Sequence, residues 1–364
     1  MKELGLHITA VVGTSIGAIN SALIVQDDFE KMKDIYDNIK LEDIIDMKEK
    51  INENKSIFNI TNIVKLAKEY TRQKGFTNQP LQEMLEKNLD LEKIYASSVD
   101  LGIVTYSLKT RAPLEKFKSE IPKDKLIDHL LASACFPIYK AQKIGETEYM
   151  DGGFYDNMPI NMLLKKGYKN IIVVDLIGIG LKRKVIDKDI YLKMIRPNED
   201  LGGTFEFNKE RMQHNIQLGY LDTLKVFNKI QGHIYYFGKR EFTKLMNHFS
   251  LKTIYGLEYA ASVYKMDKYK IYTMKSFLNE LLEKQEQAEK KYQMIKTNFD
   301  PFKEVRKLKT LIKMIDKGLG LCFFMDIVSR QPIYRTMKIV NEVFSDYIAA
   351  GDAMIELKNE SDML

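Results

Sequence analysis

A five-residue motif near the start of the chain has the composition of a nucleophilic turn. Residues 13–17 are Gly-Thr-Ser-Ile-Gly, a G-x-S-x-G sequence centred on Ser15. A serine on a sharp turn from strand to helix lifts its hydroxyl clear of its neighbours, and Gly13 and Gly17 let the backbone turn that tightly. The N-terminus of the following helix, beginning with the N–H of Ile16, would stabilise an oxyanion. The motif predicts a nucleophile, and an idle serine on a tight turn is the alternative.

A second motif has the composition of a general base. Asp151-Gly152-Gly153 follows a short strand expected at Tyr149-Met150. Two glycines behind a carboxylate leave room for another group to approach it. Taken alone, such a sequence is more often a turn than a base. Beside a serine on a nucleophile elbow, however, Asp151 is the natural acceptor of the serine proton.

The other side chains that could do chemistry give weaker patterns. The five histidines are His7, His129, His214, His233 and His248. Their spacing does not fit a metal site, and we expect structural or surface roles for them. The two cysteines, Cys135 and Cys322, are too few for a disulfide framework or a four-thiolate zinc site, so buried free thiols are expected. We therefore predict neither a metal nor a cofactor.

Three ordered segments together resemble the patatin-like phospholipase family. They are Gly-Thr-Ser-Ile-Gly-Ala-Ile-Asn at 13–20, Ala-Ser-Ala-Cys-Phe-Pro at 132–137, and Asp-Gly-Gly at 151–153 with Asn157 and Pro159 behind it. Later segments fit the next core strand and the end of the catalytic domain in bacterial members: 171–175, Arg196-Pro197 and 207–222. The resemblance covers residues 1–225, and the combination of motifs is far more specific than any one of them.

This resemblance implies a fold, a reaction and roles for the two motifs. The fold would be α/β, with a three-layer α/β/α catalytic domain at 1–240 and a mainly helical region at 241–364. The activity would be hydrolysis of lipid acyl esters through a Ser–Asp dyad and an acyl-enzyme. In that mechanism Ser15 is the nucleophile and Asp151 the general base, no histidine is needed, and the partner is a lipid or acyl-ester substrate.

The sequence departs from the family at its start. Members begin with a strand and a glycine-rich loop whose N–H groups form the oxyanion hole, but only 14 residues precede Ser15 here. Ile16 and the helix N-terminus would then be the remaining donors, and losing a donor can cost roughly 10²–10³ in kcat. We expect an N-terminally incomplete catalytic domain whose true start lies upstream, because both dyad residues are intact. The alternative is a catalytically impaired lipid- or protein-binding relative.

An α/β-hydrolase with a Ser–Asp–His triad is a further alternative. His214, His233 and His248 all follow Asp151 in the chain order that such enzymes use. Those folds place several strands before the nucleophile, and this chain has no room for them. Loss of activity on a single histidine substitution, with Asp151→Asn active, would favour this alternative.

Alternating strand and helix patterns predict the elements that carry these motifs. Apolar runs predict strands at 8–12, 99–108 and 170–176, the last fully buried in a parallel sheet. Helices are expected at 20–25, across 29–93, at 125–133 and at 159–166. After about residue 240 the pattern changes to lysine- and glutamate-rich helices, expected over 276–318 and 334–350, so we place a domain boundary there.

Composition excludes several classes of protein. The chain has 364 residues, 45% of them hydrophobic, which is too apolar for a disordered chain. Neither a signal peptide nor an apolar run of about 18 residues is visible, so we expect a cytoplasmic or peripheral membrane protein. No motif suggests nucleic-acid binding.

Charge is uneven along the chain. Residues 1–180 contain 24 Lys and Arg against 26 Asp and Glu, or −2, while residues 181–364 contain 32 against 24, or +8. The basic half, including the cluster Tyr264, Lys265, Lys268, Tyr269, Lys270 and Tyr272, could contact an anionic membrane. A solvated face over an apolar helical core is the alternative.

Overall fold

The computed structural model describes residues 2–46, 75–178, 180–296, 317–330 and 338–360. The chain divides into two compact units, Met1–Thr223 and Leu224–Leu364, each described separately below. Three of the expected helical stretches, 29–93, 276–318 and 334–350, fall partly outside the described residues.

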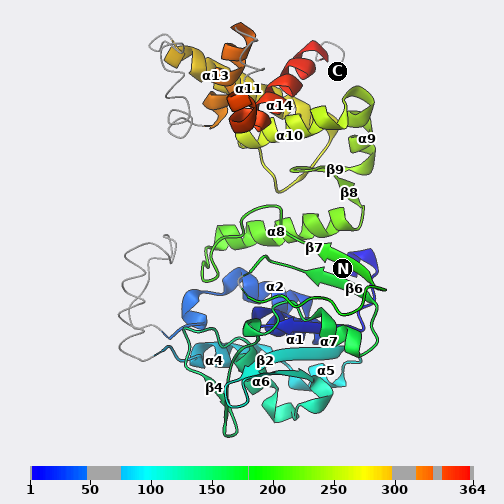
Figure 1. Cartoon of the computed structure of the whole chain (residues 1–364), viewed down its shortest axis with the longest axis vertical. Coiled ribbons are helices and arrows are strands. Elements are labelled where there is room, and N and C mark those ends of the chain that lie inside the picture. The colour runs from blue at the N-terminus through cyan, green and yellow to red at the C-terminus, as the bar shows by residue number, and fades with distance from the viewer. Residues whose placement is uncertain (1, 47–74, 179, 297–316, 331–337, 361–364) are drawn as a thin grey trace. The chain divides into compact units, whose positions relative to one another are not determined.

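The first unit alternates strands with helices (Figure 1). Its elements in chain order are η1 (Lys2–Leu4), β1 (Ala10–Thr14), α1 (Ile16–Val25), α2 (Phe29–Asn38), η2 (Leu41–Asp43), α4 (Gln79–Asn88), α5 (Leu91–Ala96), β2 (Asp100–Ser107), β3 (Ala112–Phe117), η3 (Lys118–Glu120), η4 (Lys123–Lys125), α6 (Leu126–Ser133), β4 (Gln142–Ile144), β5 (Thr147–Asp151), η5 (Gly152–Phe154), α7 (Ile160–Lys165), β6 (Asn170–Val174), β7 (Tyr191–Ile195) and α8 (Lys209–Val226). The last of these extends into the second unit.

Strand β2 is the centre of a five-stranded mixed sheet. It pairs in parallel with β1 over residues 100–104 and antiparallel with β3 over 102–107. Its last three residues, 105–107, also pair antiparallel with β5. Because β3 overlaps both of the others, it occupies one edge of β2, and β1 and β5 share the other edge. The ends of β1 and β5 therefore meet along a single edge, with Thr14 opposite Val104 and Asp151 opposite Thr105.

Helices cover both faces of this sheet. Because side chains alternate along a strand, successive residues of β2 pack against opposite faces. Leu101 and Ile103 of β2 pack into a core with α1, α4 and α6. Val104 points to the opposite face, where it packs with Phe117 and with Met162 of α7. The expected α/β fold is thereby confirmed, with β1 and β2 at the predicted places.

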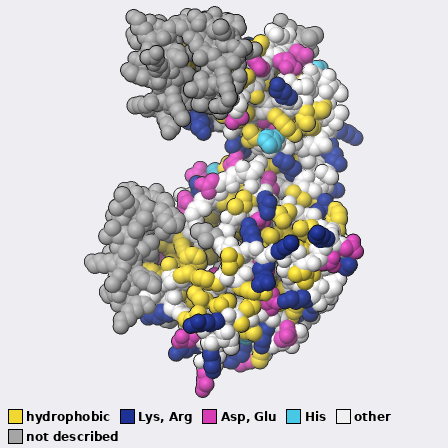
Figure 2. Space-filling view, in the orientation of Figure 1, with side chains coloured by type: hydrophobic (Ala, Val, Ile, Leu, Met, Phe, Trp, Pro, Cys, Tyr) yellow, Lys and Arg dark blue, Asp and Glu magenta, His cyan; other side chains and the backbone are white. Residues whose placement is uncertain are grey.

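Strand β6 differs from its prediction. It does pair in parallel, but within the described residues its partner is β7 alone, in a two-stranded sheet. Ile171 and Val173 are buried, whereas Val174 is 57% exposed. Ile171 and Val173 project to the face that packs with Ile160 of α7, whereas Val174 projects to the opposite face, which explains why this apolar run is only half buried. Other hydrophobic side chains also reach the surface of the first unit (Figure 2).

The second unit is mainly helical. Its elements are β8 (Ile230–Gln231), β9 (Tyr236–Gly238), α9 (Lys239–His248), α10 (Leu251–Val263), β10 (Ile271–Tyr272), α11 (Met274–Lys296), α13 (Lys317–Arg330) and α14 (Lys338–Glu360). Helix α10 crosses α14 closely at Gly256, where a Cβ would lie 2.5 Å from the Ala349 carbonyl oxygen. The unit begins earlier than the boundary expected near residue 240, because the β8–β9 hairpin packs with the helical core through Tyr235 and Phe237.

A buried carboxylate anchors this hairpin. Glu258 of α10 is fully buried and accepts hydrogen bonds from the N–H groups of His233, Ile234 and Tyr235, at 2.8 Å for Tyr235. Burial raises the pKa of Glu258, and the three N–H donors oppose that rise.

We expect Glu258→Ala to lower the free energy of unfolding of the second unit by about 3 kcal/mol, because buried N–H groups would lose their acceptor. Glu258→Gln keeps one acceptor oxygen and should cost less. Urea denaturation measures both variants, with the exposed Glu286→Ala as a control that should stay within about 0.5 kcal/mol of the parent. A Glu258→Ala variant as stable as this control would contradict the anchoring role.

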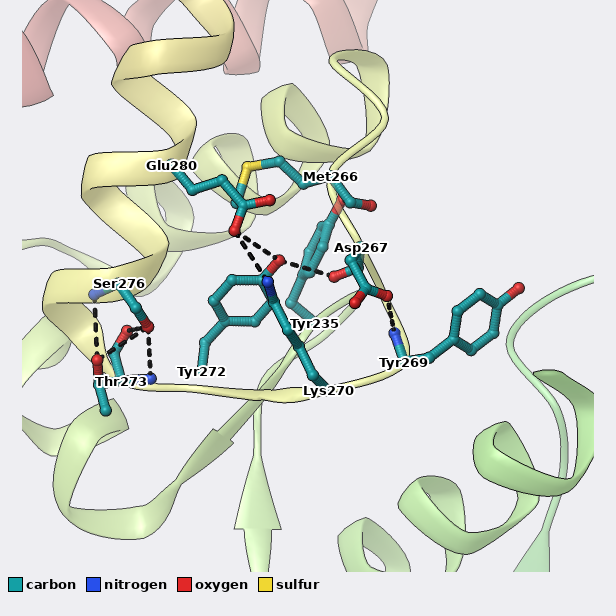
Figure 3. Close-up of polar contacts among 9 residues, drawn as sticks. All are labelled: Tyr235, Met266, Asp267, Tyr269, Lys270, Tyr272, Thr273, Ser276 and Glu280. Carbon is teal, nitrogen blue, oxygen red and sulfur yellow. Dashed lines mark hydrogen bonds and ion pairs between the residues drawn. The ribbon is translucent and has the colours of Figure 1, made fainter. Parts of the chain in front are cut away.

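The lysine and tyrosine cluster of this unit combines two buried tyrosines with exposed or half-buried residues. Tyr264 and Tyr272 are buried. Lys270 forms an ion pair with Glu280 at 3.0 Å, and the hydroxyl of Tyr272 donates to the Asp267 carbonyl at 2.8 Å (Figure 3). This arrangement favours the alternative given above, a polar surface over an apolar core. Among the helices in the described ranges, none is both long enough and apolar enough to cross a bilayer.

Candidate active site

Ser15 lies on a strained turn between β1 and α1. Its φ of 57° and ψ of −130° are unusual for a residue with a side chain, and such strain costs about 1–3 kcal/mol. The residue is the N-cap of α1, so the first N–H groups of that helix begin beside its side chain. This is the elbow that the G-x-S-x-G motif predicts.

The two glycines of the motif are not equivalent. A Cβ on Gly13 would lie 2.1 Å from the Gly17 carbonyl oxygen and 2.6 Å from the Ala18 nitrogen, so only glycine fits where β1 meets the first turn of α1. A Cβ on Gly17 would meet nothing within 4 Å. Tight packing therefore explains why position 13 requires glycine, whereas Gly17 leaves open space close to Ser15.

Asp151 is brought to Ser15 by the shared edge of β2. Its carboxylate is 5% exposed, and Oδ1 accepts the Gly153 N–H at 2.7 Å. Its own N–H donates to the Cys135 carbonyl at 3.0 Å. Burial raises the pKa of Asp151, while hydrogen-bonding interactions with Ser15 and Gly153 partly offset the rise.

One oxygen of this carboxylate is available to the serine. Oδ2 of Asp151 is buried and makes no hydrogen bond with the described residues. The Ser15 side chain interacts with this carboxylate and favours its ionised form, although Oδ2 has no hydrogen-bond partner among the described residues. Catalytic hydrogen bonds are often long in a free enzyme and shorten when substrate binds.

The glycines behind Asp151 leave room for two different groups. Gly152 leaves it for β2, because a Cβ there would lie 2.2 Å from the Val104 carbonyl oxygen, and Gly153 leaves it beside the carboxylate, because a Cβ there would lie 3.0 Å from Oδ1 of Asp151. Gly153 supplies the N–H that holds Oδ1. The loop at residues 151–153, called the base loop below, is thus pressed against the central strand β2.

Comparison with known proteins supports the assignment of this region. The sequence model of the patatin-like phospholipase family matches residues 1–164, which contain the elbow and the Asp-Gly-Gly motif. Residues 1–164 are a patatin-like phospholipase domain. The family prediction is confirmed, and lipid acyl hydrolysis is the activity class of that family. No curated protein matches the chain.

A second buried aspartate supports the base loop of the patatin-like domain. Asp156 is fully buried, and its Oδ1 accepts the N–H groups of Met158 and Arg183. Its carbonyl accepts the Thr14 hydroxyl at 2.7 Å. This last bond links Thr14, the residue directly before Ser15, to the loop that follows Asp151. Asp156 is therefore a structural carboxylate of the site that the sequence reasoning did not identify.

Histidines do not contact the dyad within the described residues. The hydrogen bonds of Asp151 go to Gly153 and Cys135. His129 is buried in α6, where burial lowers its pKa to about 4, and it is a neutral core residue at ordinary pH. Over the described part of the chain, no three His, Cys, Asp or Glu side chains gather as a metal site would require.

Proposed function

We propose that this chain hydrolyses acyl esters of lipids, as a phospholipase A-like esterase, with Ser15 as nucleophile and Asp151 as general base. The arrangement of Asp151 carries the proposal: its carboxylate interacts with Ser15, one oxygen is held by the Gly153 N–H, and the other is buried without a hydrogen-bond partner among the described residues. Oδ2 of the structural Asp156 is likewise buried without a described hydrogen-bond partner, so the feature that distinguishes Asp151 is its interaction with Ser15.

The chemistry follows from these positions. The Ser15 hydroxyl attacks the ester carbonyl and its proton passes to Oδ2 of Asp151. The tetrahedral intermediate collapses to an acyl-serine, and the alcohol leaves with the proton from Asp151. Water then attacks the acyl-serine, again giving its proton to Asp151, which returns it to Ser15 as the fatty acid departs.

The oxyanion of each tetrahedral intermediate needs donors that are in place beforehand. In the described residues the N-terminus of α1 provides them, starting with the Ile16 N–H and helped by the helix dipole. A lipid substrate also requires contact with a membrane surface. We propose a cytoplasmic enzyme that contacts an anionic membrane peripherally, favoured by the net charge of +8 spread over residues 181–364 rather than by the cluster at 264–272.

A fluorophosphonate probe tests the nucleophile directly. We expect the full chain to be modified once, at Ser15, and to hydrolyse short acyl esters and phospholipid vesicles. Ser15→Ala should lose both reactions. Ser21→Ala is the matched control, because Ser21 is a buried serine of the same helix whose hydroxyl donates to the Gly17 carbonyl at 2.7 Å, and it should keep both.

Two outcomes would contradict the proposal. Labelling that persists in Ser15→Ala would place the reactive group elsewhere. A parent protein that neither reacts with the probe nor hydrolyses esters, while binding vesicles, would favour the catalytically impaired lipid-binding alternative.

A further inference from the structure

The end of helix α6 contacts both members of the proposed dyad. Ser133 is the last residue of α6 and is fully buried, and its hydroxyl oxygen accepts the Ser15 N–H at 3.0 Å. Two residues later, the Cys135 carbonyl accepts the Asp151 N–H at 3.0 Å. Two residues, Ser133 and Cys135, thus hold the backbones of Ser15 and of Asp151. They belong to the Ala-Ser-Ala-Cys-Phe-Pro segment, for which the reaction has so far supplied no role.

The Ser133 hydroxyl also bridges two strands. It donates to the Val104 carbonyl at 2.7 Å while it accepts from Ser15. A hydroxyl has a single proton, so donation to Val104 turns a lone pair towards the Ser15 N–H. The bridge lies at the end of the β1–β2 ladder, where Thr14 is opposite Val104. It therefore links the elbow to the strand against which the base loop packs.

This bridge fulfils two physical requirements of the elbow. The strained backbone of Ser15 persists only if its surroundings hold it. Its N–H and the Val104 carbonyl also need partners, because a buried polar backbone group without one is costly. A single hydroxyl, that of the fully buried Ser133, meets both needs.

We propose that Ser133 is a positioning residue for the hydrolysis, fixing the backbone of Ser15 and hence the approach of its hydroxyl to Asp151. The inference rests on the proposed function for its chemical consequence, although the positioning itself can be measured without activity. A misplacement of about 1 Å can cost about 10²-fold in rate.

The experiment uses the full chain in four forms: parent, Ser133→Ala, Ser133→Cys and Leu130→Ala. Cysteine is close to serine in shape but is a weak donor and acceptor. Leu130 is a fully buried residue of the same helix outside the site, so Leu130→Ala controls for general destabilisation of α6. The first readout is the second-order rate constant of fluorophosphonate labelling. The second is hydrogen exchange of the Ser15 amide in ¹⁵N-serine-labelled protein, assigned by its loss in Ser15→Ala.

The proposal predicts that Ser133→Ala slows labelling by about 10²-fold and speeds exchange of the Ser15 amide by about tenfold or more, with Ser133→Cys between it and the parent. Folded Leu130→Ala should keep the parent labelling rate and the protection of this amide. Parent-like labelling in Ser133→Ala, or an unchanged Ser15 amide, would overturn the proposal. If the parent itself is not labelled, the proposed function fails, and the amide exchange alone decides whether Ser133 positions Ser15.

Discussion

Asp151→Asn should abolish ester hydrolysis and also stabilise the first unit at neutral pH. The loss of activity follows from the loss of the general base, which contributes on the order of 10²–10⁴-fold. The gain in stability follows from burial, which raises the pKa of Asp151 in the folded state, so that the ionised carboxylate disfavours folding. Asparagine has the same shape and no charge to bury.

The pH dependence of this variant has a definite sign. A folded-state pKa above the unfolded value means that the parent loses stability as pH rises from the ordinary aspartate pKa through the raised one. The difference between Asp151→Asn and the parent should therefore be small in acid and grow as pH rises through that window. In the parent, the acid limb of kcat/KM should lie above the usual aspartate pKa of about 3.9, because the base must be ionised.

Asp175→Asn is the matched control, since Asp175 is also 5% exposed. Burial alone would raise its pKa, but hydrogen bonds from Lys182, the Ile177 N–H and Arg196 lower it overall. Its ionised form thus stabilises the fold, and that stability is lost as pH falls through the lowered pKa. Thermal melts across pH should show opposite effects of the two substitutions at neutral pH. A destabilised Asp151→Asn, or one that still hydrolyses esters, would contradict the dyad.

Gly13→Ala and Gly17→Ala should have opposite effects on stability, although both glycines belong to one motif. Alanine at position 13 would overlap the backbone of the first turn of α1, which cannot move without distorting the elbow. We expect a loss of about 3 kcal/mol in the free energy of unfolding, at the upper end for overpacking. Alanine at position 17 meets open space within a helix and should gain roughly 0.5–1 kcal/mol.

Urea denaturation of the two variants checks this contrast, and fluorophosphonate labelling shows whether the elbow remains formed. Gly13→Ala should lose labelling in proportion to the distortion of the turn. A stable, fully reactive Gly13→Ala would mean that the packing of β1 against α1 differs from the one described.

The local parts of this site were predictable from the sequence, because each depends on residues close together in the chain. The elbow at Ser15, the strand before it and the Asp151 motif all have such local patterns. The roles of Gly152 and Ser133 were not predictable, because both depend on the Val104 carbonyl, which reaches the site only through the register of β2. The half-exposed β6 was missed for a similar reason, since an apolar run does not reveal whether both faces of a strand are covered.

The boundary between the two units lies before the one expected near residue 240, and contacts between distant residues explain this difference as well. The hairpin at 230–238 precedes the change to lysine- and glutamate-rich helices near residue 240, yet its carboxylate anchor, Glu258, lies in a helix beyond it. A pairing between a backbone turn and a distant side chain leaves no periodic pattern in the sequence.

The Val104 carbonyl has a further consequence for how this site can change over time. It accepts the Ser133 hydroxyl and occupies the space that a side chain at position 152 would need. Both contacts belong to the main chain, so the valine itself could be exchanged for another apolar residue without altering them. Homologous proteins should therefore accept other apolar side chains at position 104, which is fully buried, while positions 133 and 152, which contact that carbonyl, remain constrained.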